Sequence, residues 1–318
     1  MQDTTPNETA AGESRNFEAI LAQAAKRRPL QPKSLIMTIF GDSVVPRGGV
    51  IWLGNIVSLA AEFGLAEPLV RTSALRLAYD GWLVRRQSGK LSYYSMTDAY
   101  AAADAAYRSQ IYSASGELRQ NGWTIFRMFN DRLDRKAAYK LRKALDRYGF
   151  GQLAPQVFVH PSIAKSAVHH IISSSGKGED AGITFFCHEM EQNRDLLRHL
   201  LSAAWDLTEV RQGYEDFIAS FDALPALLDK HLPTPAVAFG LRTLMVHKFR
   251  RLALRDPKFP EEFFEDGWPG EKAFQLISNA YRRLLPRSEA YLDKVFQVQG
   301  GPPSAADERL FKRFSSVA

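Results

Sequence analysis

Residues 34–97, SLIMTIFGDSVVPRGGVIWLGNIVSLAAEFGLAEPLVRTSALRLAYDGWLVRRQSGKLSYYSMT, decide the fold of the N-terminal part of the chain. The stretch contains three runs with apolar residues at helical spacing: 34–45, 50–64 and 67–81. A PRGG turn separates the first two runs, and the second and third runs each stop at a glycine. We therefore expect three successive helices.

A short basic hairpin is expected directly after the third run. In residues 82–97 apolar side chains alternate with Arg85, Arg86 and Lys90 around a turn at Gln87–Gly89. Three helices followed by a basic hairpin is the order of a winged helix. In such a domain the helix after the turn enters the major groove, and cations of the wing contact phosphates. Residues 33–97 are thus predicted to bind DNA.

The third helix of this segment divides into a buried stripe and an outer face. Val70, Ala74, Leu77 and Ala78 form the stripe, and polar side chains lie off it. The predicted DNA-binding residues of the whole segment are Arg47, Arg71, Thr72, Ser73, Arg76, Arg85, Arg86 and Lys90. Two other interpretations stay open from the residues alone: a solvated helix face and a protein-docking module.

Composition limits the class of protein. The 318 residues carry a formal charge of +6, and the charge is unevenly placed: residues 33–97 hold seven Lys/Arg and four Asp/Glu, and residues 118–150 hold nine Lys/Arg and three Asp. A single cysteine, Cys187, excludes an intramolecular disulfide and a cysteine-rich metal site. The first residues are polar and acidic, and no apolar run approaches the roughly 18 residues of a membrane span, so we expect a cytoplasmic protein.

Several longer stretches are similar to the phenylacetate-degradation repressor family, PaaX. The resembling stretches run collinearly over roughly residues 33–298 and are SLIMTIFGDSVVPRGG, VRTSALRLAYDGWLVRR, SYYSMT, GWTIFRMF, LDRYGFGQLAPQVFVHP and HKFRRLALRDPKFPEEF. The resemblance implies a homodimeric repressor of an aromatic-acid (phenylacetate) catabolic operon. It also implies release from double-stranded operator DNA by an aryl-CoA effector such as phenylacetyl-CoA, with no cofactor and no membrane partner.

The resemblance also implies an α+β fold with an N-terminal winged helix-turn-helix, a ferredoxin-like middle domain and a mostly helical C-terminal domain. The expected boundaries are 1–32 for a disordered leader and short helix, 33–97 for the winged helix, 98–117 for a linker helix, 118–192 for the ferredoxin-like domain, 193–298 for the helical effector and dimer domain, and 299–318 for a loose tail.

The implied middle fold resembles small ferredoxin-like CRISPR-associated nucleases, which gives an alternative function, a metal-dependent nuclease. Those enzymes hold a metal with an aspartate at the end of the first strand. Here the run TIFRMFND ends in Phe129–Asn130, and Asp131 is displaced into the loop. We therefore expect no catalytic residues, no metal site and no enzyme.

A helix expected over 135–148 has two distinct faces. Lys136, Lys140, Lys143 and Arg147 fall on one side at helical spacing, and apolar residues line the other. The four cations could meet DNA phosphates or the phosphates of a coenzyme A, or they could form a solvated surface.

An aryl-CoA site needs an apolar slot for the ring and cations for the phosphates. Aromatic and basic residues of the middle and C-terminal regions meet this requirement, although aromatic stripes on helices are more often core. The candidate effector-binding residues are Lys140, Lys143, Trp205, Tyr214, His247, Arg250, Arg251 and Trp268.

Overall fold

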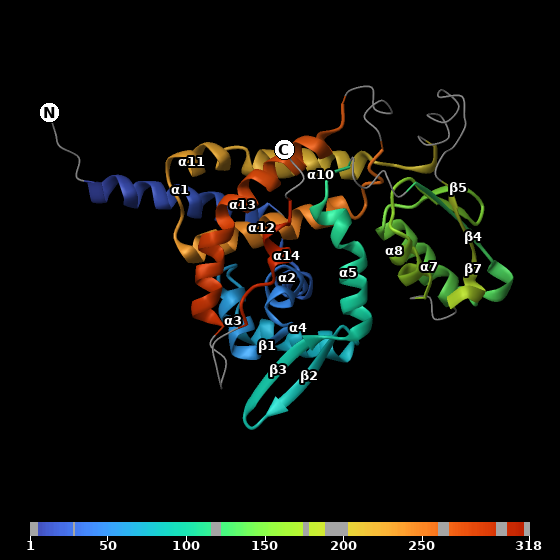
Figure 1. Cartoon of the computed structure of the whole chain (residues 1–318), viewed down its shortest axis with the longest axis horizontal. Coiled ribbons are helices and arrows are strands. Elements are labelled where there is room, and N and C mark those ends of the chain that lie inside the picture. Colours follow the sequence, from blue (N-terminus) through green and yellow to red (C-terminus); the bar gives the residue numbers. More distant parts are fainter. Residues whose placement is uncertain are drawn as a thin grey trace. The chain divides into compact units, whose positions relative to one another are not determined.

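A computed structural model describes residues 6–27, 29–115, 122–173, 178–187, 203–259, 267–296 and 304–314. The fold is α+β, with helices predominating and two small antiparallel sheets (Figure 1). The chain forms two compact units. The first unit comprises residues 1–101, 217–248 and 275–318, and the second comprises 102–216 and 249–274.

Residues 32–96 of the first unit form three α-helices, two short helical turns and a three-stranded sheet. In chain order these elements are α2 (Pro32–Ile39), the π-helical turn η1 (Phe40–Val44), η2 (Val45–Arg47), β1 (Val50–Trp52), α3 (Leu53–Ala61), α4 (Glu67–Tyr79), β2 (Leu83–Ser88) and β3 (Leu91–Met96). Between η2 and β1 the chain reverses at Gly48 and Gly49, whose φ angles of 90° and 76° favour glycine. The β2–β3 hairpin extends away from the helices (Figure 1).

The strand β1 corrects one prediction. The second apolar run was expected to be helical from residue 50, but its first three residues pair with β3 in antiparallel register, with Ile51 opposite Tyr94. The sheet order is β1-β3-β2. An apolar run as short as Val50–Trp52 fits either a helix or a strand, so local periodicity could not separate the two.

Helices from the C-terminal half complete the core of the first unit. They include α11 (Leu224–Lys230) and most of α12 (Pro235–Ala253) and α13 (Pro269–Val295). Phe239, Leu292 and Phe296 are buried in the same cluster as Leu35, Phe40 and the other apolar residues of α2, α3 and α4. The domain boundaries predicted from the sequence placed residues 33–97 and 193–298 in separate domains. In the structure parts of both share one core.

Both ends of the described chain are more ordered than expected. The helix α1 (Pro6–Lys26) covers most of the stretch predicted to be a disordered leader, and Phe17 is 1% exposed. The predicted loose tail contains the short helix α14 (Glu308–Phe311), and the buried Phe314 packs on Tyr281. Residues 1–5, 297–303 and 315–318 lie outside the described part.

The second unit contains a four-stranded antiparallel sheet with two helices against it. In chain order these elements are β4 (Trp123–Met128), η3 (Asn130–Arg132), α7 (Arg135–Arg147), β5 (Gly151–Ala154), β6 (Val157–His160), α8 (Lys165–Ser173), η4 (Gly178–Ala181) and β7 (Gly182–Cys187). The strand order is β5-β6-β4-β7. Phe126 and Met128 of β4 are buried in one cluster with apolar residues of α7 and α8, so one face of the sheet forms the core of this unit. Figure 1 shows both helices beside the sheet.

Further helical segments complete the second unit. They come from α5 (Asp98–Tyr112), α10 (Thr208–Phe221), the end of α12 and the start of α13. Among the helices described, none is both long and apolar enough to cross a membrane.

Candidate nucleic-acid interface

The outer face of α4 is the first part of the candidate interface. The helix begins after Ala66, with Pro68 in its first turn, and it buries Val70, Ala74 and Leu77 against α2 and α3. The opposite side is exposed and carries Arg71, Thr72 and Arg76. Because the buried stripe fixes the rotation of the helix, these three side chains point to solvent together.

The cations of the α4 face differ in their contacts. Arg71 donates from Nε to Glu67 Oε1 at 2.7 Å, one turn earlier. Arg76 makes no ion pair with any residue that the structure describes. Thr72 donates its hydroxyl to the carbonyl oxygen of Pro68 at 2.8 Å, which leaves the hydroxyl oxygen able to accept.

The β2–β3 hairpin is the second part. Only Leu83 of β2 is buried, and Arg85, Arg86 and Lys90 are exposed. Arg85 donates from Nε and Nη2 to Ser92 Oγ of β3, at 3.2 and 3.0 Å, which holds its side chain along the hairpin. Arg86 and Lys90 make no ion pair within the described part of the chain.

Tyr94 of β3 connects these two parts. Its ring is 2% exposed, and it lies opposite Arg85 in the β2–β3 register. Burial raises the pKa of the Tyr94 hydroxyl, and the positive charges of Arg85 and Arg71 oppose that shift. The helix α4 packs against β2 within the first unit, so the exposed cations of the α4 face and of the hairpin form one cationic surface.

Two predicted DNA-binding residues do not belong to this surface. Arg47 is 6% exposed and pairs with Glu289 Oε2 and Asp293 Oδ1 of α13, both at 2.7 Å. Ser73 is 6% exposed on the inner side of α4. Both predictions were wrong, since Arg47 has partners more than 240 positions away and Ser73 borders the buried stripe.

Exposed apolar residues on the outer face of α4 were not predicted from the sequence. Tyr79 is 92% exposed, Leu75 51% and Leu69 47%. Tyr79 follows Arg76 by three positions, so helical spacing could have placed it on the same face. An aromatic ring and aliphatic groups beside cations can contact the methyl groups of thymine in a major groove.

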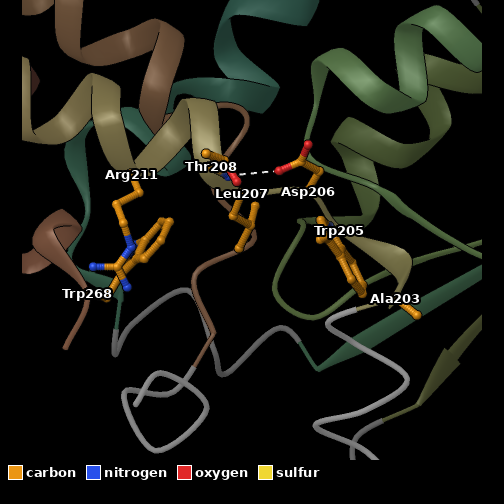
Figure 2. A pocket seen from close by; sticks show the side chains of 7 residues that line it. All are labelled: Ala203, Trp205, Asp206, Leu207, Thr208, Arg211 and Trp268. Atoms are coloured by element: carbon orange, nitrogen blue, oxygen red, sulfur yellow. Dashed lines mark hydrogen bonds between the residues drawn. The ribbon is translucent and has the colours of Figure 1, made fainter. Parts of the chain in front are cut away.

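The second unit contains a pocket of about 470 Å³. Its lining residues are Ala203, Trp205, Asp206, Leu207, Thr208, Arg211 and Trp268. The Arg211 guanidinium lies over the Trp268 ring, 5.3 Å from its centre. Figure 2 shows this pair on one side of the pocket and Trp205 on the other. Arg211 also donates to the carbonyl oxygen of Gly267 at 2.9 Å. The pocket combines aromatic walls with a held cation.

Both tryptophans of the pocket are fixed by hydrogen bonds. Trp205 donates from Nε1 to the carbonyl oxygen of Gly149 at 2.8 Å, and Trp268 donates from Nε1 to Asp256 Oδ2 at 3.0 Å. The hydroxyl of Tyr214 donates to the same carboxylate oxygen at 2.9 Å. Burial raises the pKa of Tyr214 well above its ordinary value, and the negative charge of Asp256 raises it further. This hydroxyl therefore keeps its proton.

The structure brings together only some of the candidate effector residues. Trp205 and Trp268 line the pocket, and Tyr214 lies behind Trp268. Four cations, Lys140 and Lys143 on α7 and Arg250 and Arg251 in the last turn of α12, are outside the lining. His247, also predicted to bind the effector, lies elsewhere. It is buried in the first unit, with Nδ1 2.9 Å from the hydroxyl oxygen of Thr38. Arg211 was missed, although it lies one helical turn before Tyr214.

Comparison with known proteins identifies the family. Residues 31–100 match the family described as PaaX-like protein, and residues 205–294 match the PaaX-like protein C-terminal domain. The transcriptional repressor PaaX of Escherichia coli (strain K12) is 32% identical over 307 residues, which cover 95% of this chain and 95% of that protein. The chain belongs to the PaaX family.

This assignment confirms the resemblance drawn from the sequence and makes the protein a regulator, not an enzyme. A solved structure of an uncharacterized protein from Mycobacterium tuberculosis is also similar, with 18% identity, a TM-score of 0.43 and coverage of 75% of this chain and 90% of that one. Asp131, which the nuclease alternative needs, is exposed in η3. The described residues contain no group of three His, Cys, Asp or Glu side chains placed to hold a metal. No finding favours that alternative.

Proposed function

We propose that this PaaX-family chain represses transcription by binding duplex DNA through a winged helix formed by α2, α3, α4 and the β1-β3-β2 sheet. In this proposal α4 enters the major groove, where Arg76 and Arg71 meet base edges and Tyr79 and Leu75 contact methyl groups. Arg85, Arg86 and Lys90 of the hairpin contact phosphates. The proposal is supported by the order of helices and strands and by the chain's similarity to the transcriptional repressor PaaX of E. coli.

The observation that carries the proposal is the cationic surface formed by the α4 face and the hairpin. The helix α4 packs against β2, and both elements carry exposed arginines. A groove-reading helix and a phosphate-contacting wing act together only if both face the same duplex. A solvated helix face would not require the hairpin cations to lie beside it.

The proposal is tested on DNA from the region adjoining the gene for this chain, with a random duplex of equal length as the reference. Titration is followed by fluorescence anisotropy at several salt concentrations. Arg71→Ala with Arg76→Ala should abolish the preference for the specific duplex. Arg85→Gln with Lys90→Gln should weaken binding to both duplexes. It should also make the slope of log affinity against log salt concentration shallower by about 0.9 for each phosphate that is no longer neutralised.

Absence of specific binding by the unaltered chain would refute the repressor proposal. Specific binding that neither pair of changes affects would move the interface elsewhere on the molecule.

The regulated genes and the effector are part of the same proposal. The chain would control an aromatic-acid, phenylacetate, catabolic operon and leave its operator when an aryl-CoA such as phenylacetyl-CoA binds. The pocket of the second unit supports this effector class. Trp205 and Trp268 offer apolar walls for an aryl ring, Arg211 offers a cation for an anionic group, and a volume of about 470 Å³ is typical of small-molecule sites.

The effector assignment is tested with the preformed DNA complex, by titrating phenylacetyl-CoA or free phenylacetate. We expect release by the thioester alone. Arg211→Gln should raise the thioester concentration required for release by about 10-fold or more, because a hydrogen bond to a charged group is removed. Arg255→Gln is the matched control, since Arg255 lies in the same unit, outside the pocket lining, and pairs with Glu209. If both variants were released from DNA at the same thioester concentration, the pocket would be excluded as the effector site.

The second unit is proposed to be a ferredoxin-like domain without catalytic function. This is supported by its chain order, β4-α7-β5-β6-α8-β7, and by its strand order, β5-β6-β4-β7. The functional protein is proposed to be a homodimer, because two copies related by a two-fold axis can contact two operator half-sites. Light scattering of the full chain, alone and with operator DNA, measures the number of copies.

A further inference from the structure

The helix α7 of the second unit carries a concentration of positive charge that the proposed winged helix does not use. Its 13 residues, RKAAYKLRKALDR, contain six cations and one acid. By contrast, the 27 residues of α13 contain five cations and three acids. The charge on α7 is therefore a local property of this helix.

The fold holds these cations in one direction. Asp134 caps the helix by accepting a hydrogen bond from the backbone N–H of Ala137 at 2.7 Å. Leu141 and Leu145, both 0% exposed, fix the inner face against the sheet. Positions 136, 140, 143 and 147 fall within a narrow arc on the opposite side, and all four side chains are exposed. At about 1.5 Å per residue this cation stripe is roughly 16 Å long.

Internal contacts do not account for the cation stripe. Lys136, Lys140, Lys143 and Arg147 form no ion pair with any residue of the described ranges. Elsewhere exposed arginines do find carboxylates, such as Arg71 with Glu67 and Arg309 with Asp307.

The stripe also opposes the stability of its own helix. Lys136 and Lys140, like Lys143 and Arg147, are like charges four positions apart, and such pairs repel. Arg135 and Lys136 occupy the first turn, where the helix dipole disfavours positive charge. The stripe is thus better explained by an external anion than by the fold.

We infer that the cation stripe of α7 is a second DNA-binding surface, which contacts the phosphate backbone of duplex DNA without reading its sequence. The inference rests on the proposed DNA-binding function. We choose DNA as the partner because of charge complementarity: a roughly 16 Å row of cations without ion pairs among the described residues faces a duplex that carries, on each strand, one phosphate about every 3.4 Å of helix axis. Arg76, Arg86 and Lys90 of the proposed winged helix are unpaired in the same way within the described part of the chain.

The test compares three variants of the full chain, each with fewer cations. The stripe variant is Lys136→Gln, Lys140→Gln, Lys143→Gln and Arg147→Gln. The control variant removes the same charge from exposed residues of α11 and α13, by Lys230→Gln, Lys272→Gln, Arg287→Gln and Lys294→Gln. The hairpin variant is Arg85→Gln with Lys90→Gln. Binding to specific and random duplexes is measured from 50 to 200 mM salt.

We expect the stripe variant to bind both duplexes more weakly, with the same preference between them. If all four cations contact phosphates, the slope of log affinity against log salt should be shallower by about 3.6 in this variant. Raising the salt from 50 to 200 mM should then reduce the affinity of the unaltered chain by a factor roughly 100 times larger than the factor for the stripe variant. The control variant should change much less. The melting temperature of the stripe variant should not fall, because repulsion is removed, and Lys140→Gln with Lys143→Gln provides a milder variant with half the effect.

Two results would overturn the inference. A stripe variant with the salt slope of the control, while the hairpin variant has a flatter slope, would reject the second surface and leave the proposed function intact. A stripe variant that binds DNA normally but resists release by phenylacetyl-CoA would assign the cations to coenzyme A phosphates. Absence of DNA binding by the unaltered chain would instead reject the proposed function itself.

Discussion

Two groups of arginines in the first unit use their charge in opposite ways. Arg47, Arg242 and Arg313 are buried, and each meets at least one carboxylate. Arg76 and Arg86 are exposed and pair with none of the described residues.

The buried group forms a connected network. Arg242 donates to Glu289 Oε1 at 2.6 Å and to Ser43 Oγ at 2.8 Å, and its Nε lies 3.2 Å from Asp42 Oδ2. Asp42 also accepts from Arg313 at 2.8 Å and from the hydroxyl of Tyr281 at 3.0 Å. The π-helical turn η1 presents Asp42 and Ser43 to this network. Burial and pairing, not residue type, thus separate arginines that hold the fold from arginines available to DNA.

The largest effect is expected from breaking the buried network. Arg242→Met should lower the free energy of unfolding by about 3–5 kcal/mol, because it removes a buried positive charge and the partner that this charge gives to Glu289 Oε1 and Asp42 Oδ2, although each carboxylate keeps a partner at its other oxygen. Arg283→Met is the matched control. Its pair with Asp229 is partly exposed, and removing that pair should cost about 1 kcal/mol or less. Urea denaturation measures both, and equal decreases would show that burial does not distinguish the two pairs.

The exposed group is expected to affect binding and not folding. Arg76→Ala should leave the melting temperature unchanged and weaken specific DNA binding by about 1–3 kcal/mol if Arg76 contacts a base edge. Arg71→Ala should weaken it less, because Arg71 already pairs with Glu67. Equal weakening on specific and random duplexes would assign Arg76 to a phosphate.

A smaller effect is expected from a buried group that is kept neutral. His160 of the second unit is fully buried, which lowers its pKa to about 3, and its Nδ1 accepts from the backbone N–H of Ser162 at 3.1 Å. The folded pKa lies below the unfolded value near 6.5, so the unfolded chain binds more protons between these values. Stability therefore falls as the pH drops through that window.

At pH 5.5 the decrease in stability from His160 should be about 1.4 kcal/mol relative to pH 7.5. His160→Gln removes the titrating group, so its free energy of unfolding should depend less on pH over the same range. Parallel pH profiles for the two proteins, measured by urea denaturation, would contradict the assignment to His160.

The local parts of the fold could be predicted from sequence, and the long-range parts could not. The helix α4 and the β2–β3 hairpin have clear periodicity, so their bounds and the exposure of Arg76, Arg85 and Arg86 follow from spacing. The strand β5 begins at a glycine and has no alternating pattern, and it was missed. The burial of Arg47 depends on α13, which no local pattern connects to it.

The candidate pocket was predictable only in part for the same reason. Trp205 and Trp268 could be nominated because their residue type suits an aryl group. Their grouping with Arg211 depends on how separate segments fold together, which residue spacing does not reveal. His247 was misplaced because it adjoins a basic cluster in sequence while packing against α2 in space.

The contact between Asp42 and Arg313 has a consequence for synthesis of the protein. The two residues are 271 positions apart, and a ribosome adds about 5–20 residues per second. Synthesis of Arg313 therefore follows synthesis of Asp42 in the π-helical turn by roughly 14–54 s. During that time the segment proposed to bind DNA exists without its finished core. A nascent or prematurely terminated chain would therefore lack the arginine that completes the buried network beneath that segment.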